Sequence, residues 1–102
     1  MTEHVKCMRE LYGMLMEELS GAEEYSNLAC EHKVKNPDMA KKFDSISTDE
    51  LKHAGIIEAE ISNIVKASGA DSQEMVIYDF MSDTVSDAWT RAKSAQSRYK
   101  GG

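Results

Sequence analysis

The sequence Asp49-Glu50-Leu51-Lys52-His53-Ala54 lies in the middle of a long stretch with helical periodicity. Glu50 and His53 are three residues apart, so on a helix their side chains share one face and can reach one ion together. Glu-x-x-His is the pair that two helices of a di-metal carboxylate bundle each supply, while each of the other two helices supplies a single Glu. This spacing can arise by chance in a chain with 11 Glu and 3 His, so the surrounding residues decide its meaning.

Apolar residues at steps of three and four predict three helices, over about residues 2–34, 37–67 and 72–99. Asn36-Pro37-Asp38 separates the first two helices and supplies an N-cap, a proline at the first helical position and an acid in the first turn. This connection is short, so we expect the first two helices to form an antiparallel hairpin.

The third helix is expected to follow a short linker. Gly69 predicts the end of the second helix, and Asp71 with Glu74 three residues later suggests a capping box for the third. The expected fold class is therefore all-α, a hairpin plus a C-terminal helix. We expect residues 1–68 to form the hairpin and to carry half of a metal site, and residues 69–102 to form the linker and third helix with a mobile Gly101-Gly102 tail.

Three apolar seams are expected to make the helix contacts, and polar residues interrupt the first two. The first seam is Met8, Leu11, Leu15, Glu18, Ala22, Tyr25 and Ala29, the second is Phe43, Ile46, Glu50, His53, Ile57, Ile61 and Ile64, and the third is Tyr78, Met81, Val85, Ala88, Ala92, Ala95 and Tyr99. A carboxylate at a core position is costly unless it is paired or bound to a metal. Gly21, inside the first helix, suggests the close approach of a neighbouring element.

Glu18, Glu50 and His53 are expected to meet. Counted from the hairpin turn at ~1.5 Å per residue, they stand at heights of about 27, 21 and 26 Å on facing helices. Two carboxylates and one imidazole are half of a di-metal site, and a two-fold related dimer would supply the other half while forming a four-helix bundle. Such ligands suit iron or manganese, and zinc could also bind them.

Composition narrows the range of functions. A net charge of -6 argues against nucleic acid as a partner, and no apolar run approaches the roughly 18 residues of a membrane span. The polar N-terminal sequence has no signal-peptide core, which predicts a cytoplasmic protein. Cys7 and Cys30, about 35 Å apart on the first helix, are expected to be free thiols packed as small apolar residues.

The sequence resembles the ferritin-like superfamily, most closely its short encapsulated ferritins and the helical half of rubrerythrins. The matching motifs are Glu17-Glu18-Leu19 leading to Tyr25, and residues 43–47 leading to Glu50, His53 and Ala54. The resemblance implies that Glu18, Glu50 and His53 are metal ligands at a site shared by two chains, with Tyr25 beside it. Ser20 and Glu24 depart from the encapsulated ferritins at positions that are acidic and tryptophan in those proteins.

The resemblance implies oxidation of Fe(II) to Fe(III) for iron storage or detoxification, with two iron ions at each dimer interface. The catalytic set would be Glu18, Glu50, His53 and Tyr25, in a homodimer or higher homo-oligomer with an encapsulating shell protein as a further partner. Leu15, Ala22, Ile46 and Ile57 would form an apolar wall around the ligands. If the site is active, the enzyme is a ferroxidase-type oxidoreductase.

Two other functions stay open. One is a rubrerythrin-like peroxide reductase, although the chain has no Cys-x-x-Cys for a rubredoxin-type site. The other is a metal-free helical assembly protein, in which His53 bonds to Glu50 and Tyr25 is a packed aromatic residue. We expect His4 and His32 to be surface residues. We also expect Asp49, Glu58 and Glu60 to lie on solvated faces, where Glu60 could relay cations.

Overall fold

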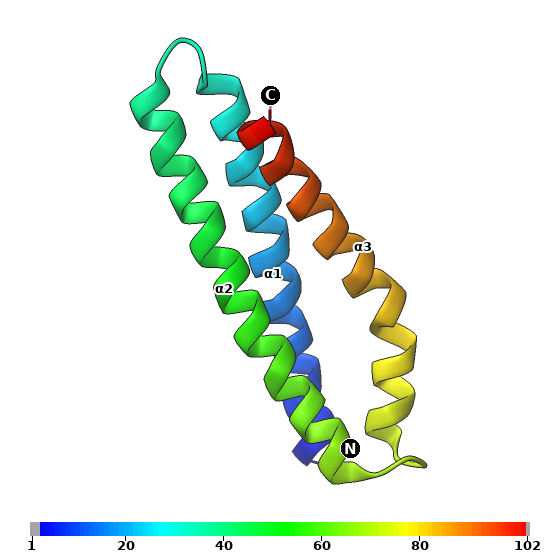
Figure 1. The fold of residues 1–102 in the computed structure, drawn as a ribbon. Helices are drawn as coiled ribbons and strands as arrows, with labels where there is room; N and C mark the ends of the chain where they lie inside the picture. The colour runs from blue at the N-terminus through cyan, green and yellow to red at the C-terminus, as the bar shows by residue number, and fades with distance from the viewer. Residues whose placement is uncertain (1–2, 102) are drawn as a thin grey trace.

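The computed structural model describes residues 3–101, which form three long helices joined by two short connections (Figure 1). α1 spans Glu3–His32, α2 spans Pro37–Ser68 and α3 spans Gln73–Gly101. α1 and α2 form the antiparallel hairpin that was predicted, and α3 runs back along them to give a rod of 53 × 19 × 16 Å. The all-α prediction is confirmed for the described residues. Within the same range, no helix combines the length and the apolar character needed to cross a membrane.

Local sequence signals explain where the helices begin and end. The Asn36 side chain accepts a hydrogen bond from the Met39 amide at 3.3 Å, as expected of an N-cap. Gly69 ends α2 with a φ of 96°, and its amide donates to the Val65 carbonyl at 3.2 Å. α3 continues to Gly101, beyond the predicted end at residue 99, while the predicted helical residue Thr2 and the tail residue Gly102 lie outside the described residues.

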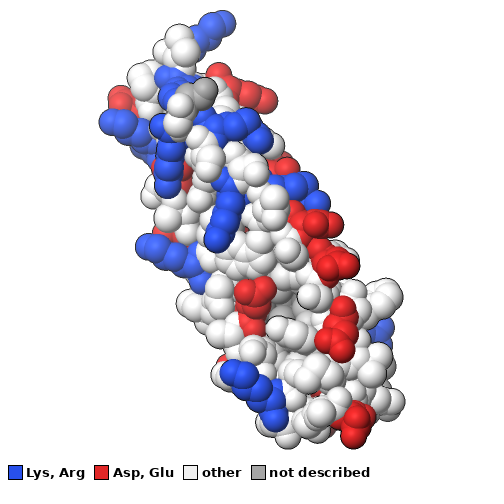
Figure 2. All heavy atoms as spheres, turned by 45° about the vertical axis from the view of Figure 1, so that its right-hand side comes forward, with Lys and Arg blue, Asp and Glu red and all other residues white. Residues whose placement is uncertain are grey.

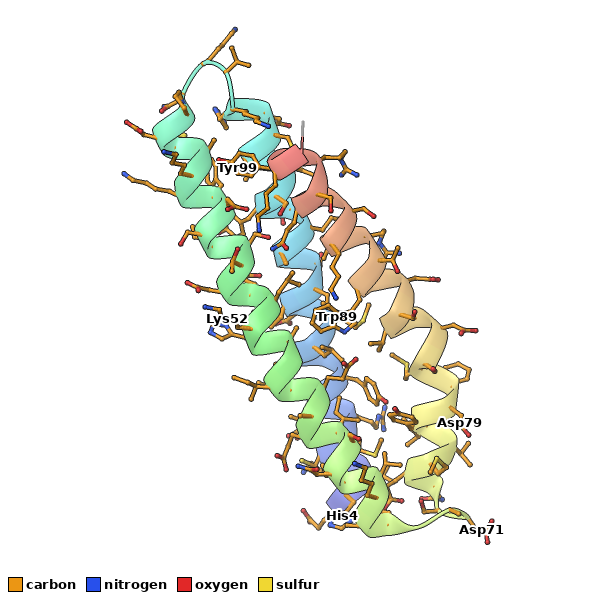
Figure 3. All side chains as sticks on the ribbon, viewed as in Figure 1. His4, Lys52, Asp71, Asp79, Trp89 and Tyr99 are labelled. Carbon is orange, nitrogen blue, oxygen red and sulfur yellow. The ribbon has the colours of Figure 1, made fainter. Side chains whose placement is uncertain are left out.

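The cap of α3 differs from the prediction. Ser72, not Asp71, accepts the hydrogen bond from a first-turn amide, that of Met75, at 3.1 Å. Glu74 is buried instead of reaching back to the cap, and its Oε2 lies 3.7 Å from His4 Nδ1. His4 is exposed, as expected, and its ring also lies 3.3 Å from the Ser68 hydroxyl. His4, Ser68 and Glu74 thus join the three helix ends at the lower end of the rod, where Figure 3 labels His4 and Asp71.

The buried stripe of α1 is rotated relative to the predicted seam. Leu19 is 1% exposed and fills the core position that the sequence had assigned to Glu18, and Ser26 likewise replaces Tyr25. The physical reason is that α1 contacts both α2 and α3, so its buried face is centred between two neighbours, not on the hairpin partner alone. Glu18 consequently lies at the edge of the buried face, on the side away from α3.

Small residues hold α1 and α2 close together. The residues of α2 that are fully buried toward the turn are Ala40, Ser47 and Ala54, at steps of seven, while the predicted seam residue Ile46 is 40% exposed. Ser47 Oγ donates to the Ala22 carbonyl at 2.7 Å and lies 2.8 Å from Ser26 Oγ. The short side chains allow the two helix axes to approach, because interaxial distance depends on the side chains at the contact.

α3 packs on the hairpin through alanines in its C-terminal half and through larger residues in its N-terminal half. Ala88, Ala92 and Ala95 are buried as predicted, whereas Tyr78, also placed on the predicted seam, is 38% exposed. Trp89 lies between α3 and the hairpin, as Figure 3 shows, while Lys52 projects from the side of α2 away from α3. Of the two free cysteines, Cys7 is exposed, which corrects the expectation that it packs as an apolar residue, and Cys30 is half-buried.

Charge is unevenly distributed along the rod. Lys and Arg gather at the end that holds the hairpin turn and the C-terminus of α3, whereas acidic side chains dominate lower on the face seen in Figure 2. The exposed basic residues of that end are Lys33, Lys35, Lys41, Lys42, Arg98 and Lys100. The net charge of -6 is therefore carried mainly by the rest of the molecule.

Candidate metal centre

Glu18 of α1 and His53 of α2 lie side by side at mid-rod. Their Oε2 and Nδ1 atoms are 3.5 Å apart, and the side chains are 29% and 60% exposed, respectively. The equal heights calculated for these two residues from the hairpin turn are therefore confirmed. The structure pairs His53 with Glu18, whereas the metal-free interpretation of the sequence paired it with Glu50.

Glu50 packs directly against the backbone of α1 at Gly21. A Cβ added at residue 21 would lie 2.9 Å from Glu50 Cδ and would overlap Glu50 Oε2. The close approach that the sequence indicated at Gly21 is therefore real, and the approaching group is a carboxylate. Because only glycine leaves this space free, Gly21 allows Glu50 to stand beside Glu18 on the facing helix.

The electrostatic surroundings of Glu50 favour a bound cation. Its pKa is raised above the ordinary value of 4.5 by burial first and then by the negative charge of Glu18, with Glu24 adding to the effect and His53 opposing it. Crowded carboxylates of this kind are stabilised when a positive ion shares them. Glu24 was not among the residues chosen from the sequence as ligands, although its position three residues after Gly21 places it on the same side of α1.

The chain by itself supplies an incomplete ligand set. Among residues 3–101, no three His, Cys, Asp or Glu side chains converge closely enough to hold an ion. The donors at hand are two carboxylates and one imidazole, half of the four carboxylates and two histidines of a di-metal bundle site. Their chemistry fits iron, since hard carboxylate oxygens with imidazole nitrogen are ligands that iron accepts in proteins.

The structure places Tyr25 and the four residues of the expected apolar wall in different environments. The Tyr25 ring packs against Phe43 with centroids 6.0 Å apart, consistent with a packed aromatic residue. Seven residues of helix separate Tyr25 from Glu18, about 10.5 Å along the axis, whereas its height from the hairpin turn differs by only about 4.5 Å from that of Glu50 on the facing helix. Of the wall, Leu15 and Ala22 are buried, while Ile46 and Ile57 remain partly exposed.

Glu23 of α1 and Glu58 of α2 lie on the side of the hairpin that contacts α3. Arg91 of α3 lies 3.6 Å from Glu23, and Trp89 donates to Glu58 at 3.0 Å. Glu58 was expected on a solvated face, and its interaction with α3 corrects that expectation. The three ligand candidates therefore lie on the side of the hairpin that α3 does not cover.

Comparison with known proteins gives an independent finding. The family model described as Rubrerythrin matches residues 14–78, a segment that contains Glu18, Tyr25, Glu50 and His53. No curated protein and no solved structure matches the chain. The match extends over well over half of the chain and includes all three candidate ligands, and the structure over this range is helical. The chain therefore belongs to the rubrerythrin family, within the ferritin-like superfamily.

Proposed function

We propose that two copies of this chain form a ferritin-like di-iron protein that oxidises Fe(II) to Fe(III), with Glu18, Glu50 and His53 of each copy as ligands. Members of the rubrerythrin family typically bind iron. The observation that carries the proposal is the pairing of Glu18 with His53 at 3.5 Å, while Glu50 packs against Gly21 near enough for both of their charges to shift its pKa, on a side of the hairpin left open by α3. Two carboxylates and one imidazole are half of a di-metal ligand set, and a second copy of the chain related by a two-fold axis would supply the same three groups again.

The open side of the hairpin has the composition of a subunit interface. Partly exposed apolar residues flank the ligand candidates along both helices: Leu11, Met14, Tyr25 and Leu28 on α1, and Met39, Phe43, Ile46, Ile57 and Ile64 on α2. Exposed contiguous apolar surface around a polar centre is typical of interaction sites. A second hairpin on this surface would bury these residues and bring its own three ligands to the first set.

The ligands would perform distinct tasks. Glu50, whose raised pKa reflects its burial and the neighbouring carboxylate of Glu18, would gain most from shared positive charge and is the expected bridging ligand. His53 would supply the neutral nitrogen donor through its ring, and Glu18 would hold that ring in position. Iron is the substrate here: two Fe(II) ions together release two electrons, enough to reduce oxygen to hydrogen peroxide, or peroxide to water, without a one-electron product.

The first experiment measures iron oxidation. Fe(II) is added aerobically, and the rise in ferric absorbance is compared for the wild-type protein, His53→Ala and the matched control His4→Ala, whose histidine joins the helix ends far from the site. We expect the rapid rise in ferric absorbance to be lost in His53→Ala and retained in His4→Ala. Equal rates for wild type and His53→Ala would contradict the proposal. A strict requirement for an added electron donor would instead favour the peroxide reductase that the family match also suggests.

The second experiment tests the dimer. Ile46→Asp places a charge on the open side of the hairpin, whereas Phe80→Asp places the same charge on α3, where Phe80 is 81% exposed. We expect light scattering to show a shift toward monomer for Ile46→Asp, with loss of bound iron, and no shift for Phe80→Asp. A wild-type chain that remains monomeric while binding iron would contradict the shared site.

A further inference from the structure

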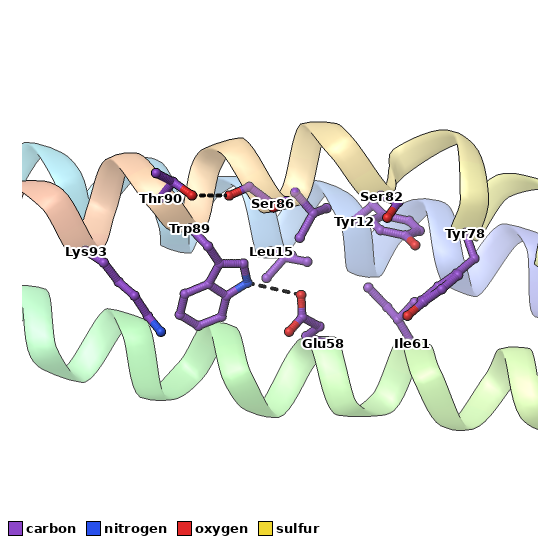
Figure 4. A pocket seen from close by; sticks show the side chains of 11 residues that line it. Tyr12, Leu15, Glu58, Ile61, Tyr78, Ser82, Ser86, Trp89, Thr90 and Lys93 are labelled. Atoms are coloured by element: carbon purple, nitrogen blue, oxygen red, sulfur yellow. Dashed lines mark hydrogen bonds between the residues drawn. The ribbon is translucent and has the colours of Figure 1, made fainter.

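A second candidate site lies between α2 and α3, away from the metal-ligand candidates. It is a cleft of about 370 Å³, open to solvent along one side, with residues of all three helices in its lining (Figure 4). On α2, Glu58 of this cleft is rotated from Glu50 by about 80°, given ~100° of helix rotation per residue. The cleft therefore faces α3, whereas Glu50 faces the open side of the hairpin.

One carboxylate dominates the polar lining of the cleft. Glu58 Oε2 accepts a hydrogen bond from Trp89 Nε1 at 3.0 Å, which fixes the carboxylate but leaves its negative charge in place because the indole donor is neutral. Tyr12 is 7% exposed, and burial, followed by the nearby Tyr78 and Glu58, raises its pKa to about 12. Both phenols are neutral at neutral pH, so Glu58 is the acidic side chain among the residues that line the cleft, and Lys93 is the basic one.

The rest of the lining combines apolar and aromatic side chains with the hydroxyl groups of Ser82, Ser86 and Thr90 and with Lys93 at the rim. Its apolar lining residues Leu15, Ile61 and Val85 are exposed by 0%, 1% and 7%. The rings of Tyr78 and Trp89 extend from α3 at either end of the cleft (Figure 4). The Lys93 ammonium lies 5.4 Å from the centroid of the Trp89 ring, within the range of a cation–π interaction. The indole face is therefore already in contact with a cation at the rim.

We propose that this cleft binds a small organic cation, with an ammonium group at Glu58 and a flat apolar body between Tyr78 and Trp89. A carboxylate attracts an ammonium group by its charge, and nearby aromatic rings such as those of Tyr78 and Trp89 can add cation–π attraction. The volume of 370 Å³ is near the lower end of the range for ligand pockets, about 300–1,000 Å³, so the ligand must be small. The site is separate from the proposed iron chemistry and does not depend on it.

Trp89 provides the assay, because it is the only tryptophan of the chain. Phenethylammonium is titrated against the full chain while tryptophan fluorescence is recorded, with isothermal calorimetry as a second measurement. We expect saturable binding with a Kd of about 1 mM or tighter, as befits so small a ligand. The anion 3-phenylpropanoate, with a similar body and the opposite charge, should bind at least about tenfold more weakly.

Two charge-removing variants make the test specific. Glu58→Gln keeps an oxygen that can accept from Trp89 but removes the negative charge, so phenethylammonium should bind about tenfold more weakly. Lys93→Gln removes a competing positive charge, so binding should be unchanged or tighter. His53→Ala should leave the titration unaltered, which separates this site from the metal centre.

Three results would overturn the proposal. They are the absence of saturable binding up to about 10 mM phenethylammonium, equal binding of the cation and the anion, and wild-type affinity in a Glu58→Gln variant whose helicity is intact by circular dichroism. Weaker cation binding after Lys93→Gln would also contradict it, because a positive side chain cannot attract a positive ligand.

Discussion

Replacing Gly21 by alanine should separate metal binding from folding stability. A Cβ at residue 21 would lie 2.9 Å from Glu50 Cδ, whereas ordinary contacts begin at 3.4 Å, so the carboxylate must retreat by at least the difference of 0.5 Å. Metal–ligand distances tolerate only about ±0.2 Å. Loss of groups that position a ligand typically costs about 10–100-fold in metal affinity, and we expect a loss of that size.

The same substitution should not destabilise the metal-free protein. Alanine is favoured over glycine in a helix interior by about 1 kcal/mol. The group that must move is the end of a flexible side chain, and moving it toward solvent relieves part of the burial that raises the pKa of Glu50. Gly13→Ala is the matched control, because Gly13 lies in the same helix and a Cβ there would meet nothing within 4 Å.

The assay combines iron binding and thermal unfolding of both variants and the wild type. A gain of 1 kcal/mol corresponds to about 4–8 °C in Tm for a domain of this size. We expect Gly13→Ala to gain stability and keep wild-type iron affinity, and Gly21→Ala to keep or gain stability while losing iron. Unchanged iron affinity in Gly21→Ala would refute the reasoning that this glycine makes room for a metal-ligating carboxylate.

Three further predictions concern the metal-free protein. Because folding raises the pKa of Glu50, its ionised form opposes folding, so Glu50→Gln should raise Tm at neutral pH. Thermal unfolding across pH should show that this gain in Tm vanishes well below pH 4.5, where the carboxyl is protonated in both states. Ser47→Ala removes a buried hydroxyl that interacts with Ala22, Ser26 and Gln96, and should cost about 1–3 kcal/mol in urea unfolding; a loss no greater than that of exposed Ser45→Ala would contradict the network. Gly69→Ala should cost about 1–3 kcal/mol, because its φ of 96° and ψ of 169° suit only glycine; Gly55→Ala, with open space around it, should not be destabilised.

The helix boundaries, and the heights of the metal-ligand candidates along the hairpin, could be predicted from the sequence because the signals are local. Asn36, Pro37 and Gly69 set helix ends through their own backbone preferences and short-range hydrogen bonds. Along an antiparallel hairpin, height follows from counting residues, which is why Glu18 and His53 were expected to meet and do so. The glycine at position 21 likewise indicated a close approach, although not which side chain approaches.

Which side of each helix is buried was decided only by the tertiary structure. Helical periodicity shows that a stripe is apolar, but its centre depends on how many neighbours the helix has. α1 packs against two helices, so Leu19 is buried and Glu18 is displaced to the edge, toward the open side of the hairpin.

The contacts of α3 are likewise long-range. Glu58 with Trp89, and His4 with Glu74, join residues 31 and 70 positions apart along the chain. No local signal links such pairs, because their proximity depends on how α3 folds back along the hairpin. The sequence by itself therefore determined the helices and the heights of Glu18 and His53 along the hairpin, whereas the packing of three helices decided which carboxylates are buried, which are paired and which remain exposed.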